Sequence, residues 1–142
     1  MPGLQRAVTV AAPPERVWEV VTDVERWPER IPTVEAAERL DAGPLAVGSR
    51  ARLRQPRLPE GVWTVTSLVD GASYTWESRS SGVTVTAGHV VAPHREGCRL
   101  TLTLTVSGPM AWLGWLMSRS LTARYVETEA ASVKRVAESM TP

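Results

Sequence analysis

The chain has 142 residues, of which 43% are hydrophobic and 22% are charged. These values are typical of a globular domain, and we expect one domain over residues 1–142. The 16 basic and 15 acidic residues leave a net charge of +1, which argues against a nucleic-acid-binding surface. Cys98 is the only cysteine, so an intrachain disulfide and a Cys/His zinc cluster are excluded.

Residues 1–10 have neither the basic start nor the apolar centre of a signal peptide. The longest apolar stretch, residues 110–117, is too short to cross a bilayer. We therefore expect a cytoplasmic protein without integral membrane association. Lys134 is the only lysine among the basic residues, which indicates GC-rich coding of an actinobacterial, hence bacterial, type.

The N-terminal part predicts one strand followed by two short helices. Residues 6–11 alternate between apolar and polar, as in a half-buried strand. Prolines stop this strand, and residues 15–21 then predict a helix with Val17, Val20 and Val21 on one face. Asp23 is the expected cap of a second short helix around residues 25–27.

After this region the helical period disappears and turn signals separate six predicted strands. Short loops between consecutive strands indicate an antiparallel meander with one covered face. The strands are expected at residues 34–40, 49–55, 62–69, 73–79, 83–91 and 99–106.

Gly108 and Pro109 end the sheet, and residues 110–140 predict one long helix. Its apolar positions recur at spacings of three, four and seven, so this stripe must be buried against the sheet. The positions are Leu113, Leu116, Met117, Leu121, Tyr125, Val133, Val136 and Met140. The sequence thus predicts an α+β protein whose seven-stranded curved antiparallel sheet wraps around one long C-terminal helix and leaves a cavity between them.

Short motifs spread over almost the whole chain resemble the SRPBCC superfamily (START, Bet v 1-like and polyketide cyclase/dehydrase proteins). They occur in the family's order at residues 12–18, 23, 27–28, 47–49, 55–56, 63–65, 74–76, 82, 89–93 and 108–109, and then at Tyr125 and Glu129 in the long helix. The resemblance implies the helix-grip fold and a deep cavity for lipids, sterols, hormones or polyketides. Some members cyclise, aromatise or dehydrate polyketides, but the superfamily has no shared catalytic motif.

Trp63 and Trp76 lie in adjacent predicted strands. They either offer aromatic faces to a planar ligand or fill the core. His89 is in phase with Val85, Ala87 and Val91. It is either a general acid or base in the cavity, or an imidazole that is hydrogen-bonded to backbone or lies on the outer face.

Glu129 falls on the apolar stripe of the long helix, in line with Tyr125 and Val133. A buried, unpaired carboxylate is costly. Glu129 must therefore either pair with a partner such as an arginine, Tyr125 or His89, or carry a proton and act as an acid. An ion pair at the helix edge is the structural alternative.

Arg50, Arg52 and Arg54 alternate with Ala51, Leu53 and Gln55 along one strand. The simplest arrangement exposes the arginines, either as a solvated face or as a site for an acidic carrier protein. Leu53 and Gln55 then face the cavity, where Gln55 either orients a ligand oxygen or is a packed core glutamine.

Trp112 and Trp115 open the long helix beside the predicted cavity mouth. They could form a lid, a contact in a homodimer, a membrane-surface anchor, or ordinary packing under the loop at residues 56–61. Few basic residues precede Arg119, which argues against the membrane role.

The sequence contains no nucleotide-binding glycine loop, zinc-protease motif or nucleophile elbow, and it predicts no metal site and no cofactor. Two hypotheses remain, both with a small hydrophobic ligand as partner. The first is a polyketide cyclase/dehydratase-like enzyme in which His89 or Glu129 moves a proton and Gln55 or Tyr125 holds an oxygen. In the second, a non-catalytic carrier uses the same cavity.

Overall fold

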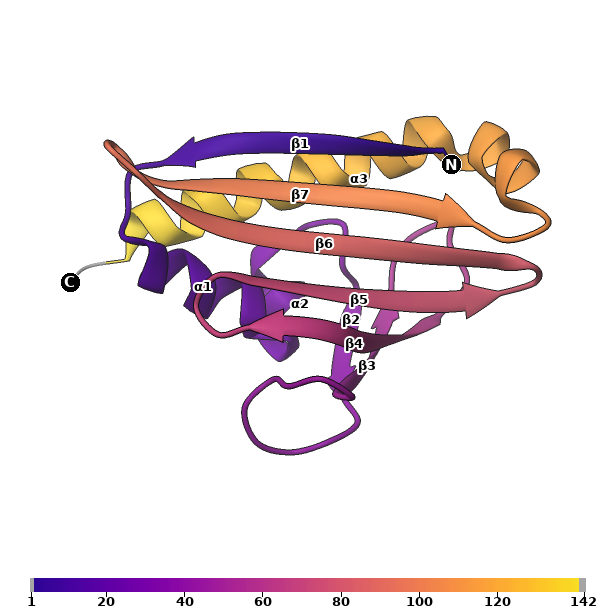
Figure 1. Cartoon of the computed structure of the whole chain (residues 1–142), viewed down its shortest axis with the longest axis horizontal. Coiled ribbons are helices and arrows are strands. Elements are labelled where there is room, and N and C mark those ends of the chain that lie inside the picture. The colour runs from indigo at the N-terminus through magenta and orange to yellow at the C-terminus, as the bar shows by residue number, and fades with distance from the viewer. Residues whose placement is uncertain (1, 141–142) are drawn as a thin grey trace.

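The computed structural model describes residues 2–140 and has the predicted α+β helix-grip architecture (Figure 1). Seven antiparallel strands form one sheet in the order β1-β7-β6-β5-β4-β3-β2. The strands are β1 (Gly3–Val10), β2 (Ala36–Arg39), β3 (Arg50–Arg54), β4 (Gly61–Val69), β5 (Ser73–Ser80), β6 (Val83–His94) and β7 (Gly97–Ser107). The helical elements are α1 (Pro14–Thr22), the 3-10 turn η1 (Val24–Arg26), α2 (Trp27–Arg30) and α3 (Ala111–Ser139).

Alternating apolar and polar residues build the sheet, because successive side chains of a strand point to opposite faces. In β7, for example, Leu100, Leu102 and Val106 are buried. The β6–β7 pairing extends to His94 and Gly97, so β6 is longer than the sequence predicted. A register shift between Val65 and Ser67 marks an irregularity in β4, and such bulges bend a strand.

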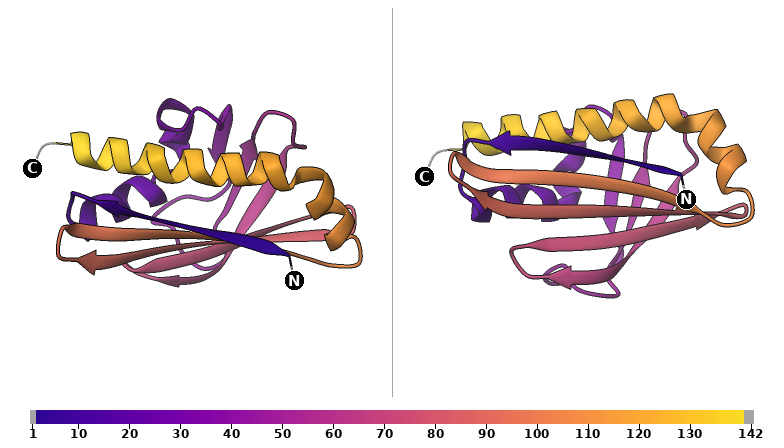
Figure 2. Two further views of the ribbon diagram at one scale, coloured as in Figure 1. Left: turned by 90° about the horizontal axis from the view of Figure 1, so that it is seen from above. Right: turned by 45° about the horizontal axis from the view of Figure 1, so that its top comes forward.

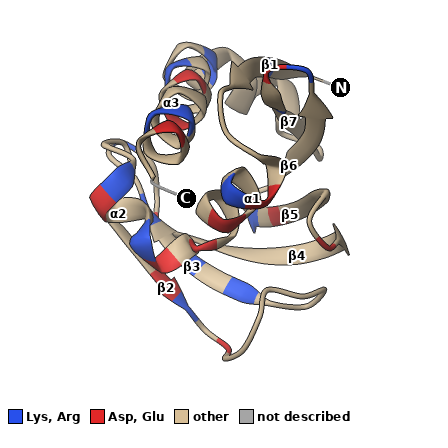
Figure 3. Ribbon diagram, turned by 90° about the vertical axis from the view of Figure 1, so that its left-hand side faces the viewer, with Lys and Arg blue, Asp and Glu red and all other residues tan. Residues whose placement is uncertain are grey.

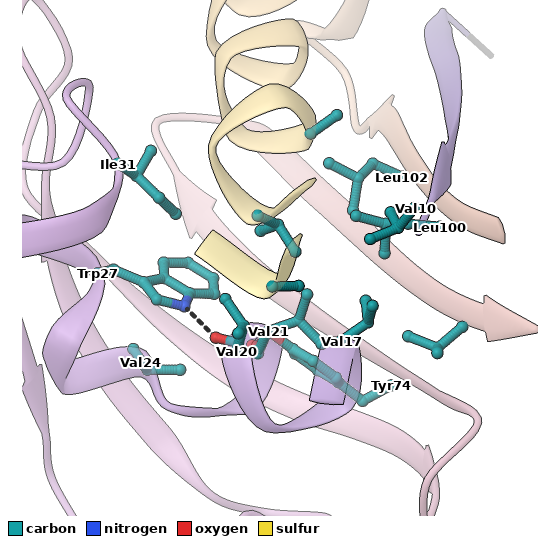
Figure 4. Close-up of a cluster of buried hydrophobic side chains, with 14 of the residues drawn as sticks. Val10, Val17, Val20, Val21, Val24, Trp27, Ile31, Tyr74, Leu100 and Leu102 are labelled. Carbon is teal, nitrogen blue, oxygen red and sulfur yellow. Dashed lines mark hydrogen bonds between the residues drawn. The ribbon is translucent and has the colours of Figure 1, made fainter. Parts of the chain in front are cut away.

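The long helix α3 lies along one face of the sheet, and α1 and α2 lie at one end of this sandwich (Figures 1 and 2). The predicted apolar face of α1 is confirmed, since Val17, Val20 and Val21 are fully buried. Figure 4 shows this core, in which the Trp27 Nε1–H donates a hydrogen bond to the Val20 carbonyl at 3.3 Å. The bond joins the start of α2 to α1.

Asp23 lies at the predicted cap position, directly before η1, but its side chain does not act as a cap. The Asp23 side chain makes no capping hydrogen bond. Its carboxylate instead lies 3.7 Å from Arg30 Nη1. The Asp23 carboxylate therefore faces the charged Arg30 of α2 and not the backbone N–H groups at the start of the helix.

The prediction for the start of α3 is also partly wrong. Tyr125 and Val133 are buried as expected, but Leu113, Leu116 and Met117 are exposed. Figure 2 shows that the first turns of α3 run at an angle to the rest of the helix. In this region the Ser118 hydroxyl donates to the Gly114 carbonyl at 2.7 Å, a contact that commonly bends helices. Within residues 2–140, no helix is long and apolar enough to span a membrane.

Candidate functional site

A cavity of about 190 Å³ lies between α3 and the strands that face it. Most of its lining is aliphatic or aromatic, and most of its polar side chains come from α3. The others are His89 of β6, Thr103 of β7 and Gln55, which directly follows β3. The apolar lining includes Leu53, Leu58, Val83, Val85, Ala87, Leu102, Leu104, Val106 and Val126. Such a space favours a ligand that is largely hydrophobic.

The two ends of the cavity differ in burial. At one end the lining residues Trp27, His89 and Leu102 are almost completely buried. At the other end, Val83 and Gly114 are only half-buried. The cavity therefore opens near the β5–β6 turn and the first turns of α3, and it closes near α2.

His89 and Glu129 meet at the closed end. The His89 Nε2 lies 3.3 Å from Glu129 Oε2. Only 3% of the His89 side chain is exposed, against 21% of the Glu129 side chain. The other imidazole nitrogen, Nδ1, lies 3.3 Å from the Tyr74 carbonyl oxygen. Because a carbonyl only accepts, this contact requires that Nδ1 carries a proton and leaves Nε2 facing the carboxylate.

Tyr74 supports this pair from the neighbouring strand. Its ring is fully buried and its hydroxyl donates to the Val21 carbonyl at 2.6 Å. Burial, and secondly the negative charge of Glu129, raise the pKa of Tyr74 well above its ordinary value. The phenol therefore keeps its proton near neutral pH, so Tyr74 positions the site without exchanging protons in it.

Three tryptophans form an aromatic wall beside His89. The Trp76 ring lies 5.5 Å from Trp27 and 5.6 Å from Trp63, measured between centroids. Trp76 also meets His89 edge to face at 6.0 Å. All three tryptophans line the cavity, where they present flat apolar faces to its contents.

The remaining candidates also border this cavity. Leu53, Gln55 and Tyr125 are all lining residues. The Tyr125 hydroxyl, however, donates to the Pro56 carbonyl, so it holds the β3–β4 loop against α3. Gln55 makes no side-chain hydrogen bond within residues 2–140, so its amide is available to a ligand.

The arginines of β3 lie outside the cavity. Arg50, Arg52 and Arg54 are exposed, and the residues between them are buried. Arg52 lies 2.8 Å from Glu38, and Arg54 lies 3.7 Å from Glu35. Figure 3 shows this mixture of both charges along β2 and β3. Such a mixed face offers little attraction to an acidic partner.

Two residues that shape the site were not identified from the sequence. Tyr74 alternates with Trp76 on β5, so the phase of that strand could have placed it toward the interior. Trp27 borders the cavity because α2 packs so that its ring lies against Trp76 of β5. No local sequence pattern indicates that packing. Among residues 2–140, no group of three or more His, Cys, Asp or Glu side chains is placed to hold a metal ion.

A family model described as polyketide cyclase / dehydrase and lipid transport matches residues 1–138. No curated protein sequence matches the chain. Solved structures with a similar fold include the ZhuI aromatase/cyclase from Streptomyces sp. R1128, at 21% identity and a TM-score of 0.78, over 96% of this chain and 93% of that one. A START superfamily protein from Mycobacterium smegmatis is 19% identical with a TM-score of 0.75, over 98% and 99% of the two chains. Norcoclaurine synthase from Thalictrum flavum is 14% identical with a TM-score of 0.74, and the match covers 96% of this chain and 93% of that one.

Proposed function

Because the chain belongs to the polyketide cyclase / dehydrase and lipid transport family, we propose that it binds a small polyketide-like molecule in its cavity and promotes cyclisation or dehydration by general acid–base chemistry. One observation carries the proposal: the 3.3 Å approach of His89 Nε2 to Glu129 Oε2 at the closed end of an apolar cavity. Two titratable groups in such a place can exchange a proton with a bound ligand.

We infer that a proton lies between the facing atoms of the pair, because without one two acceptor atoms would face each other at 3.3 Å. With Nδ1 protonated toward Tyr74, the contact is either an imidazolium with a carboxylate or a neutral imidazole with a carboxylic acid. Both forms have the same total charge. In either form the pair keeps a basic atom, so it can accept a second proton from a ligand and afterwards give a proton back.

A cyclisation needs both capacities in sequence. The basic atom of the pair takes a proton from the carbon next to a ligand carbonyl, and the resulting enolate carbon forms a C–C bond with a second carbonyl carbon. The oxygen of that second carbonyl takes up the proton, so the pair returns to its starting state. Dehydration then removes a further C–H proton while the C–O bond breaks, and the departing hydroxide and this proton leave as water.

The other lining groups have positioning roles in this proposal. The faces of Trp63 and Trp76 hold a planar ligand between the sheet and α3. The free amide of Gln55 donates to a ligand oxygen. Confinement of a flexible chain in a reactive geometry contributes in addition, because proximity alone lowers a barrier by several kcal/mol.

The aliphatic part of the cavity supports a second candidate, a carrier without catalysis. Toward the opening, the walls are formed by Val83, Val85, Leu104 and Val106. These side chains provide burial for an apolar ligand but no chemistry. A carrier needs only this half of the cavity, whereas the enzyme also needs the His89–Glu129 pair.

Hydrogen–deuterium exchange of 2-tetralone, a bicyclic ketone, tests both candidates without the natural substrate. Binding is followed by quenching of tryptophan fluorescence, and exchange of the protons next to the carbonyl is followed by NMR in deuterated buffer. We expect His89→Asn and Glu129→Gln to bind 2-tetralone within a few-fold of the unmodified protein and to lose at least about 100-fold in exchange rate. Exchange that both variants retain would refute the enzyme. If the unmodified protein binds 2-tetralone without promoting exchange, the non-catalytic carrier is the remaining candidate.

A further inference from the structure

Five large apolar side chains are exposed within residues 110–117, at the start of α3. They are Met110, Trp112, Leu113, Leu116 and Met117, with exposed fractions from 44% to 81%. The other exposed large hydrophobic side chains of residues 2–140 are Leu40, Val47, Val69 and Val90, which are far apart in the sequence. A clustered apolar patch on a protein surface marks an interaction site more often than scattered residues do.

The exposed side chains point away from the cavity. With about 3.6 residues per turn, Trp112, Leu113, Leu116 and Met117 occupy one half of the helix circumference. Gly114 and Ser118 lie on the opposite half and line the cavity. The outer face is therefore not needed to enclose a ligand, although it is only one helix diameter from the opening.

The charged side chains within the helix segment that carries this patch are all basic. Residues 107–126 contain Arg119 and Arg124 and no aspartate or glutamate. Both arginines are exposed, and neither forms a salt bridge within residues 2–140. Arg124 follows on the same side of the helix as Leu113 and Met117. The sequence-based argument against a membrane role considered only the residues before Arg119 and missed this arrangement.

We propose that segment 110–117 docks onto the surface of an anionic lipid bilayer, with Trp112, Leu116 and Met117 inserted at the interface and Arg119 and Arg124 near the head groups. Tryptophan and apolar side chains on one helix face, followed by arginines, are the features of interfacial helices. This contact brings the cavity opening to the membrane, so an apolar ligand passes between the lipid and the cavity without crossing water.

The size of the patch favours lipid over a second copy of the chain. A stable protein interface uses about 20–30 residues on each side. Here five apolar side chains on about two helical turns form the exposed patch. Such a patch inserts into a bilayer without needing a complementary protein surface, and each inserted side chain contributes separately.

Vesicle sedimentation tests the proposal with two matched double variants. Leu116→Ser/Met117→Ser removes two exposed side chains of the patch, and Val47→Ser/Val69→Ser removes two side chains of similar exposure elsewhere. We expect the unmodified protein to bind phosphatidylcholine vesicles that contain a quarter phosphatidylglycerol. The patch variant should bind at least about tenfold more weakly, and the control variant should bind equally well. Arg119→Gln/Arg124→Gln should lose only the component of binding that added salt removes.

Three results would overturn the proposal: no binding of the unmodified protein, equal binding by the patch variant, or a dimer in analytical ultracentrifugation that the patch variant abolishes while vesicle binding is absent. Thermal melting of each variant shows whether it is folded. The 2-tetralone exchange takes place in solution and does not involve Leu116 or Met117. Failure of docking is therefore distinguishable from failure of the proposed chemistry.

Discussion

Tyr74 stacks face to face on His89, with ring centroids 4.1 Å apart and an angle of 10° between the ring planes. The two residues are direct cross-strand partners in β5 and β6. Tyr74 also supplies the carbonyl that faces His89 Nδ1, while its hydroxyl is bonded to Val21 in α1. One residue thus fixes both the plane of the imidazole and the nitrogen that points to Glu129.

Tyr74→Phe should flatten the loss of stability at alkaline pH. The folded-state pKa of Tyr74 is raised by burial and by Glu129, so its contribution is fully present below the unfolded pKa of about 10 and is lost as pH rises. Above pH 10, unfolding releases this proton and the free energy of unfolding falls by about 1.4 kcal/mol per pH unit. Phenylalanine removes that term.

Urea unfolding of both proteins between pH 7 and pH 11.5 provides the comparison. At pH 7 the variant should be less stable by about 1–3 kcal/mol, because the buried Val21 carbonyl loses its donor. The difference should shrink above pH 10. A constant difference over the whole range would contradict the burial of the phenol.

Glu138→Gln should lower stability near neutral pH but not in acid. The Glu138 carboxylate accepts from the Ala11 N–H at 2.8 Å and pairs with Lys134 at 2.8 Å. The Ala11 bond first, and then Lys134, lower the pKa of Glu138 below its ordinary value. A lowered folded-state pKa gives stability that is present above the unfolded pKa and is lost as pH falls through the folded one.

Thermal melts of Glu138→Gln and the unmodified protein should therefore differ at pH 7, and the difference should shrink as the pH falls below the ordinary glutamate pKa of about 4.3 and through the lowered folded-state pKa. The effect is small, because the pair is partly exposed and solvent screens it. The contrary finding would be melting temperatures that differ equally at pH 7 and in this acid range.

The alternation of side chains explains why much of the sheet could be predicted from the sequence. Once a strand is identified, its period of two assigns each residue to a face. The cavity side of β6 follows from His89 being in phase with Val85 and Ala87, all of which line the cavity. The same reasoning placed the β3 arginines outside the cavity and Leu53 inside.

Contacts between distant elements were less predictable. Glu129 was expected to find one of several partners, and nothing local in the sequence selects His89, which lies forty residues earlier on another element. The predicted burial of the apolar residues at the start of α3 was wrong for a related reason. A helical apolar period shows that a face is amphipathic, but it does not show whether the sheet extends far enough to cover it. The exposed Leu116 and Met117 are the result.

Gly88→Ala tests the close approach of β6 to β7 beside His89. Gly88 pairs with Thr103 across these strands, and a Cβ at Gly88 would collide with the Thr103 hydroxyl. We expect a cost of about 1–3 kcal/mol in the free energy of unfolding. Thr103→Ala removes the obstacle, so the double variant should recover at least about 1 kcal/mol relative to additivity. Simple additivity in chemical denaturation would show that the collision is relieved in some other way.

Filling the cavity should separate ligand binding from stability. The Ala87 side chain borders the cavity, so Ala87→Leu places three further carbon atoms in open space. We expect it to stabilise the protein by about 0.5–2 kcal/mol. It should also weaken 2-tetralone binding at least about tenfold, because the added atoms occupy the volume beside Trp76, the cross-strand partner of Ala87.

Ala51→Leu is the matched control. Ala51 is a fully buried strand residue, whereas Ala87 is partly buried, and Ala51 lies outside the cavity lining. Enlarging Ala51 in packed surroundings should cost about 1–3 kcal/mol. If both variants are destabilised to the same extent in urea titrations, the space beside Ala87 is already filled by neighbouring side chains in solution, and the ligand must bind elsewhere.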